Sequence, residues 1–257
     1  MNLYEDQFSE DHDFPRCEKP SKILVIASTG RCGSHMLGHA LHQTGKFGFP
    51  LEYANGANLA EWKKRLGINN FREVITELQR RRTSPNGVFG IKIHYPQLAR
   101  FGGFSEVMSL FPDAYYVLLS RKDVLGQAIS LSIAGQAGVW IPGQKPVNDN
   151  PVYSFEHIDG CLRGGILNTA SWRYVLSASG SNFIELNFDY VRRNLPNAIK
   201  SIANFMDVEI DPKDIPEQQV ISKQSNNRNE DWRKRFISEF SKGTELIPIN
   251  CNIDVIK

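Results

Sequence analysis

The sequence contains few cysteines, and none of them has the spacing that binds zinc or carries redox chemistry. The four cysteines, Cys17, Cys32, Cys161 and Cys251, include no CxxC pair in a chain of 257 residues. Scattered cysteines indicate reduced thiols in a cytoplasmic protein rather than a disulfide framework. Cys32 stands beside an arginine, and we interpret it as a small residue that fills a turn rather than as a nucleophile.

Long apolar segments and a strong net charge are also missing. No apolar segment approaches the ~18 residues that a membrane-spanning helix needs. The formal net charge of +2 gives no global field that would attract nucleic acid or anionic lipid. We therefore expect neither partner, and a single domain over residues 21–257. Residues 1–20 are acidic and polar, unlike a secretory signal or a transit peptide, and we expect a flexible N-terminal arm there.

The chain does contain an apolar run that ends in a glycine-containing turn. Ile23–Ala27 is apolar without alternation, which predicts a strand buried on both faces, as in a parallel sheet. Helical spacing resumes at Met36. A turn between a strand and a helix binds anions such as phosphate or sulfate, because backbone amides and the helix dipole converge there. The residues expected to hold the anion are Thr29, Gly30, Arg31, Cys32, Gly33, Ser34 and His35.

Two signatures of metal-dependent enzymes are absent. The second glycine of the turn is followed by Ser34–His35 instead of the lysine and hydroxyl residue of nucleotide triphosphatases. The apolar segment 114–120 ends before a basic residue rather than before a magnesium-binding acid. A metal-dependent kinase is therefore disfavoured. Three histidines share one helical face without the glutamate of a zinc helix, and we expect no metal at His35, His39 and His42.

Two further strands are expected to end in basic residues. Residues 88–94 form an apolar run in which Lys92 and His94 point to the same side. Residues 114–120 form another apolar run, and Arg121 and a helical pattern follow it directly. A second anion site is therefore expected at the end of this strand. The fold class that follows is α/β, a three-layer α/β/α sandwich with a central parallel sheet and a phosphate-binding loop after the first strand.

Two segments outside the strands are candidates for shaping an acceptor site. Glu52 lies between apolar neighbours just after the first helix, so it is a candidate general base, or else an ordinary loop acid. Residues 141–159 are rich in proline, glycine and asparagine, which is typical of a long loop that covers an active site. A helix is expected to follow over residues 164–178, and a fourth strand over residues 182–187.

Five segments together resemble the PAPS-dependent sulfotransferases, specifically the bacterial trehalose 2-sulfotransferase-like family, where PAPS is 3′-phosphoadenosine 5′-phosphosulfate. The resemblance extends over about residues 22–240, and five motifs in order are far more specific than one. The segments are TGRCGSHML from Thr29, GFPLEY from Gly48, GVFGIKIH from Gly87, Arg121–Leu131 with the later Gly138-Val139-Trp140, and Lys223-Gln224 through Arg228 to Trp232.

The resemblance implies PAPS as sulfuryl donor, adenosine 3′,5′-bisphosphate (PAP) as product, and no metal. It places Arg31 on the sulfate oxygens and Lys92 near the bridging oxygen or the acceptor. In the trehalose-type enzymes the general base is a glutamate, and the corresponding residue of this sequence is Glu52. Other cytosolic sulfotransferases use a histidine, which would be His94; we favour Glu52, because the surrounding segments follow the trehalose-type pattern. Contacts with the 3′-phosphate and the rest of the nucleotide are implied for Arg121, Ser130, Lys223, Gln224 and Arg228.

The acceptor is expected to be a small polar molecule. A sugar hydroxyl is the family's example, and a secondary metabolite, including a hydroxyl or nitrogen of a saxitoxin-type alkaloid, fits equally. A homodimer is an expectation at the level of the family. Two other hypotheses stay open from the sequence: an ATP-dependent small-molecule kinase with a degenerate phosphate loop, and a catalytically inactive nucleotide-binding protein.

Overall fold

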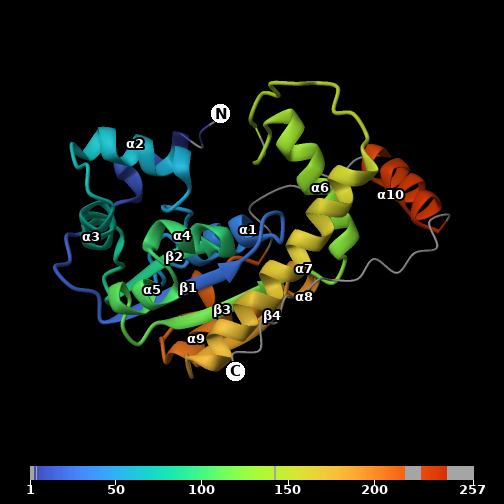
Figure 1. The fold of residues 1–257 in the computed structure, drawn as a ribbon. Coiled ribbons are helices and arrows are strands. Elements are labelled where there is room, and N and C mark those ends of the chain that lie inside the picture. The colour runs from blue at the N-terminus through green and yellow to red at the C-terminus, as the bar shows by residue number, and fades with distance from the viewer. Residues whose placement is uncertain (1–2, 4, 142, 218–226, 242–257) are drawn as a thin grey trace, which may run out of the picture.

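The computed structural model describes residues 3, 5–141, 143–217 and 227–241, which form a four-stranded parallel sheet flanked by helices. In spatial order the sheet is β2-β1-β3-β4, and in Figure 1 all four arrows point the same way. The carboxyl ends of the strands therefore meet at one edge, where ligands bind in open α/β sheets. The strands are β1 (Lys22–Ser28), β2 (Val88–His94), β3 (Tyr115–Ser120) and β4 (Phe183–Asn187), which confirms the four expected ones.

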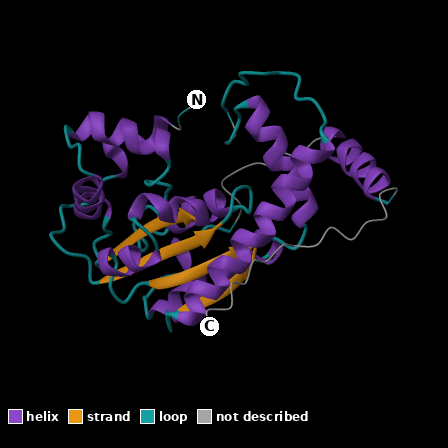
Figure 2. Cartoon of the chain, in the orientation of Figure 1, coloured by secondary structure: helices purple, strands orange, loops and turns teal. Residues whose placement is uncertain are grey.

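Helices cover both faces of the sheet, so the expected α/β/α layering is confirmed (Figure 2). On one face, α1 (Ser34–Gln43) and α9 (Leu195–Met206) pack against alternate residues of β1 and β3. The other face is covered by α2 (Gly56–Leu66), α3 (Phe71–Arg82), α4 (Leu98–Phe101), α5 (Phe104–Leu110) and the second half of α7 (Phe155–Ala178). The short described elements are η1 (Glu5–Phe8), η2 (Glu10–His12), η3 (Tyr95–Gln97), α8 (Phe188–Arg193) and η4 (Pro212–Asp214).

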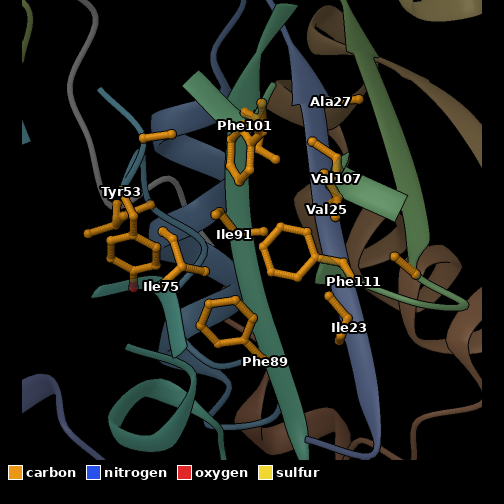
Figure 3. Packing of buried hydrophobic residues seen from close by; sticks show 14 of the residues in the cluster. Ile23, Val25, Ala27, Tyr53, Ile75, Phe89, Ile91, Phe101, Val107 and Phe111 are labelled. Atoms are coloured by element: carbon orange, nitrogen blue, oxygen red, sulfur yellow. The ribbon is translucent and has the colours of Figure 1, made fainter. Parts of the chain in front are cut away.

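Side chains alternate along each strand, so neighbouring strand residues pack against opposite helix layers. Val25 and Ile91 lie in the core on the α5 side, and Figure 3 shows them beside Phe101 and Phe111. Leu24 and Ile26 face the opposite layer and pack with α1. Because both faces of β1 are covered, all of its apolar residues are buried, which explains the uninterrupted apolar run in the sequence.

A smaller apolar cluster joins α6 (Val124–Ala137), the first half of α7 and α10 (Asn227–Phe240). Trp232 and Phe236 of α10 are buried there against Ile129 and Ile158. These three helices extend beyond the sheet edge on the side of the strand ends (Figure 1). None of the described helices is long and apolar enough to cross a bilayer.

Two local expectations differ from the structure. The covering loop, expected over residues 141–159, stops earlier because α7 begins at Phe155, where the hydroxyl of Ser154 caps the helix by accepting from the amide of His157. The described part of the expected N-terminal arm is packed rather than loose. Phe8 is buried in the main core, and Arg82 of α3 donates to the carbonyl groups of Gln7 and Ser9.

Candidate active site

The turn between β1 and α1 has the backbone of an anion site. Arg31 and Gly33 have positive φ values of 63° and 88°, so the chain turns sharply at both. Gly33 occupies the N-cap of α1, and among the described residues no side chain caps this helix. The start of a helix, with its amides and the positive end of its dipole, is a place where anions bind. A Cβ at Gly33 would lie 2.0 Å from the Phe188 ring, so only glycine fits there.

Arg31 is held at the mouth of this turn. Its Nε donates to Ser130 Oγ at 3.1 Å, and its Nη1 donates to the carbonyl of Trp140 at 2.5 Å. Burial, together with the positive charge of Arg121, lowers the pKa of Arg31 to about 10, so the guanidinium stays charged at neutral pH. The predicted site residue Ser130 thus contacts Arg31.

Arg121 lies beside the same turn. Its Nη1 donates to the carbonyl of Arg31 at 3.3 Å, and its guanidinium stacks 5.5 Å from the centre of the Phe188 ring. Its buried Nε has no hydrogen-bond partner among the described residues. A partly buried guanidinium with an unused donor fits an anionic group such as a phosphate. The structure therefore brings Arg31 and Arg121 to one site.

An ion pair from the C-terminal helix fixes the surroundings of Arg121. Arg233 of α10 donates to both carboxylate oxygens of Asp123, at 2.7 and 2.6 Å. Asp123 caps α6 by accepting from the amide of Gly126 and lies 3.9 Å from Arg121. Burial would raise the pKa of Asp123, but Arg233 and the Gly126 amide hold it below its ordinary value. Asp123 is thereby engaged by Arg233 more closely than by Arg121.

A second group of side chains surrounds Glu52 at the end of β2. Lys92 Nζ lies 2.9 Å and His94 Nε2 3.3 Å from Glu52 Oε2, and Glu52 Oε1 accepts from Gln97 at 2.6 Å and from Asn55 at 3.3 Å. Burial favours the neutral acid, but His94 and Lys92 outweigh it and hold the pKa of Glu52 well below its ordinary value. The carboxylate is therefore ionised at neutral pH.

Both nitrogens of His94 have partners, because Nδ1 lies 3.0 Å from Ser28 Oγ while Nε2 faces Glu52. His35 lies near the same group: burial and the charge of Lys92 lower its pKa to about 2, so its ring is neutral. The three predicted residues Glu52, Lys92 and His94 thus form one cluster. No three His, Cys, Asp or Glu side chains of the described residues are grouped to hold a metal ion.

The remaining predicted residues belong to the turn after β1 or to the C-terminal segment. Cys32 is fully buried in the apolar cluster under α1, so its side chain does not face the turn. Ser34 is buried as the first residue of α1, and Thr29 accepts from Gln127 Nε2 at 2.8 Å. Arg228 lies in the first turn of α10. Lys223 and Gln224 lie outside the described residues.

Several polar residues of the site escaped the sequence prediction. Gln97 and Asn55 carry no local pattern that distinguishes them from surface amides, and Arg233 is one of several basic residues in a charged helix. Only Gln127 had a signal, since it belongs to a motif shared with the resembled family. Its amide holds the turn through Thr29 Oγ1 and the carbonyl of Gly30, at 2.8 and 2.7 Å.

Comparisons with known proteins identify the family of this chain. The family model described as Stf0 sulphotransferase matches residues 23–239. The trehalose 2-sulfotransferase of Mycobacterium tuberculosis is 26% identical over 257 residues, covering 84% of this chain and 94% of that protein. The protein of the same name from Mycolicibacterium smegmatis is 23% identical over 261 residues, covering 85% of this chain and 95% of that protein.

Two solved structures share the fold. A sulfotransferase from Alicyclobacillus acidocaldarius matches with a TM-score of 0.51 at 14% identity, covering 85% of this chain and 92% of that one. The sulfotransferase domain from the Synechococcus PCC 7002 olefin synthase matches with a TM-score of 0.50 at 14% identity, covering 87% and 97%. At this identity the likeness establishes the α/β fold.

Proposed function

Because the chain belongs to the Stf0 sulphotransferase family and is therefore a sulfotransferase, we propose that it moves the sulfuryl group of PAPS to a hydroxyl or nitrogen of a small acceptor. The observation that carries this proposal is that Arg31 lies in the turn before α1 and that Arg121 donates to the Arg31 carbonyl, so both cations lie at this turn. Two adjacent guanidinium groups fit a donor with phosphate at two positions. The kinase hypothesis lacks both the phosphate-loop lysine and support from the family.

In the proposed reaction, the sulfur–oxygen bond to the 5′-phosphate breaks while the acceptor attacks in line. Sulfuryl transfer, like phosphoryl transfer, passes through a loose transition state, so the protein acts chiefly by positioning groups and neutralising charge. Arg31 and the amides of Gly30–Ser34 hold the sulfuryl and 5′-phosphate oxygens. Arg121 holds the 3′-phosphate.

We assign the general base to Glu52. Its carboxylate is ionised at neutral pH, and the segments around it follow the trehalose-type pattern. When Glu52 accepts the proton of the acceptor, its charge is lost and Lys92 becomes free to neutralise the leaving phosphate. His94 then acts as a positioning residue that orients Glu52.

The donor assignment is tested by calorimetry with PAP and with ADP. Wild-type protein should prefer PAP, and Arg121→Ala should remove that preference by weakening PAP about 10- to 150-fold, the range for a hydrogen bond to a charged group. Arg65→Ala is the matched control, because it removes the same charge from the exposed surface of α2. Equal affinities of the wild-type protein for PAP and ADP would contradict the proposal.

The base assignment is tested by kinetics with any acceptor that mass spectrometry shows to gain a sulfonate. The acceptor panel contains trehalose, a saxitoxin-type alkaloid and simple alcohols and phenols. Glu52→Gln should lower kcat about 100- to 10,000-fold, the usual contribution of a general base. His94→Asn should cost less; the reverse order would move the base to His94. PAP binding without turnover of any acceptor would indicate an inactive nucleotide-binding protein.

A further inference from the structure

A cavity of about 300 Å³ lies between the turn after β1 and the helices α6 and α7. Thr29 and Gly30 form its inner wall, and Glu156 and His157 lie at its exposed rim. Most of the remaining lining is apolar or lacks side chains. The apolar residues are Val124, Ala128, Leu131 and Leu162.

Three glycines of α7 keep this cavity open. A Cβ added at Gly160, Gly164 or Gly165 would meet no heavy atom within 4 Å, so close packing does not require glycine at any of them. A glycine inside a helix costs about 1 kcal/mol relative to alanine. All three line the cavity, where side chains would project into its space.

A buried amide also borders the cavity with an unused acceptor. Gln127 is 7% exposed, and its Nε2 is engaged by Thr29 and Gly30. No donor among the described residues contacts its Oε1. An amide oxygen of this kind can accept from a ligand that brings a hydroxyl or N–H group.

The cavity and the proposed catalytic cluster border neighbouring residues of the chain, because Thr29 and Gly30 line the cavity and Ser28 contacts the cluster. Ser28 Oγ contacts His94, and the carbonyl of Ser28 accepts from Trp172 of α7 at 3.0 Å. Asn168, one turn earlier on α7, lines the cavity. Arg121 and Phe188 are not among the cavity-lining residues, so of the turn assigned to the nucleotide only Thr29 and Gly30 border the cavity.

We propose that this cavity binds the body of the acceptor, and that the acceptor is an amphipathic alcohol or phenol with an apolar body and a hydrogen-bond donor directed at Gln127. This inference rests on the proposed sulfotransferase reaction and narrows its acceptor class. A disaccharide carries hydroxyl groups on all sides, and the aliphatic wall and the glycines leave most of them without a partner. The cavity therefore disfavours a sugar.

The test uses 2-naphthol and cyclohexylmethanol as probes, with trehalose as the sugar, and measures binding by calorimetry with and without PAP. Gly164→Leu fills the cavity. Gly135→Leu is the matched control, because Gly135 also lies inside a helix, has no heavy atom within 4 Å of an added Cβ, and lies on α6 outside the cavity. Gly164→Leu should weaken at least one of the two probes at least tenfold and leave PAP affinity unchanged, and Gly135→Leu should change neither.

Three results would overturn the proposal: neither probe binds, Gly164→Leu leaves probe binding intact, or Gly164→Leu weakens PAP instead of the probes. Failure of the donor assignment is recognised separately, because PAP would then bind no better than ADP while the probes still report on the cavity.

Labelling of Cys161 gives a readout that does not depend on the folding of a variant. This thiol lines the cavity, and burial raises its pKa, so alkylation is followed above pH 9, and the Cys161 peptide is quantified by mass spectrometry. Cyclohexylmethanol keeps its hydroxyl proton at this pH, so when bound in the cavity it should slow labelling of Cys161 and leave Cys17 unaffected. Equal labelling with and without a saturating probe would contradict binding at this place.

Discussion

Replacing Glu52 by glutamine should cost more stability than replacing its partner Lys92 by methionine. The Lys92 side chain is 5% exposed, and Glu52, 2.9 Å away, is its only charged or hydrogen-bonding side-chain partner among the described residues. Glu52→Gln therefore leaves a buried ammonium without a counter-charge, which costs about 3–5 kcal/mol. Lys92→Met leaves the carboxylate with three other polar neighbours, so the loss is closer to that of one charged hydrogen bond, about 1.5–3 kcal/mol.

Urea denaturation of the two variants and the double variant measures this asymmetry. The double variant buries neither charge, so its loss should be smaller than the sum of the single losses by about 0.5–3 kcal/mol. In a domain of this size 1 kcal/mol corresponds to about 2–4 °C in Tm, so Glu52→Gln should lower Tm by at least about 6 °C. Equal losses in the single variants, or strict additivity, would refute the account of a buried pair.

The pH dependence of stability follows from the same cluster. The pKa of Glu52 is depressed in the folded protein, so its contribution is fully present above its ordinary pKa and is lost as pH falls through the folded value. The difference in unfolding free energy between wild type and Glu52→Gln should stay constant from about pH 7 to 5 and narrow below about pH 4, near the ordinary pKa of glutamate. A difference that does not narrow in acid would contradict this assignment.

Two other changes test the donor side of the site. Arg233→Ala should release Asp123 to pair with Arg121 and weaken PAP binding about tenfold in calorimetry. Adding Asp123→Asn to this variant should restore binding. If it does not, Asp123 does not compete with PAP for Arg121. Gly33→Ala should destabilise the protein by at least 1–3 kcal/mol in urea and abolish PAP binding, because it adds a clash to the strain of a φ of 88°. Gly67→Ala, with a φ of 67° and open space around its Cβ, measures the strain alone, and an equal cost for both would contradict the clash.

The sheet could be predicted because its strands are buried on both faces and read as uninterrupted apolar runs. The start of α7 could not, because Phe155–Arg163 mixes charged and apolar residues, and its partners lie on α6 and α10, which are distant in sequence. Packing of the N-terminal segment depends on Phe8, a single aromatic residue among acids, and on the buried Arg82. Such isolated anchors leave no periodic signal.

The site residues also differ in how far they could be predicted from the sequence. The turn after β1 was predictable, because glycine, hydroxyl and basic residues follow a buried strand directly. Glu52, Lys92 and His94 were each singled out from the sequence, but their clustering depends on how residues distant in sequence pack. Gln97 and Arg233 gave no signal, since an amide or a surface-like arginine becomes distinctive only through its partner in the fold.

The position of Glu52 depends on the space left by a glycine in β2. Leu51 pairs with Ile91 in a single parallel bridge, and its carbonyl accepts from the Lys92 amide at 2.9 Å, so the segment runs beside β2. A Cβ at Gly90 would lie 2.4 Å from the Phe47 carbonyl oxygen, so this segment can approach the strand only because residue 90 has no side chain.

Gly90→Ala should therefore displace the segment that carries Glu52, while the turn after β1 keeps its structure. We expect kcat to fall at least tenfold, since small misplacements of catalytic groups are costly, while PAP affinity changes less than twofold. Stability should fall by about 1–3 kcal/mol, the usual cost of overpacking. Gly135→Ala is the control, because its Cβ meets nothing within 4 Å. If Gly90→Ala weakened PAP and left kcat unchanged, the segment would serve the donor, and Glu52 would lose its place as the base.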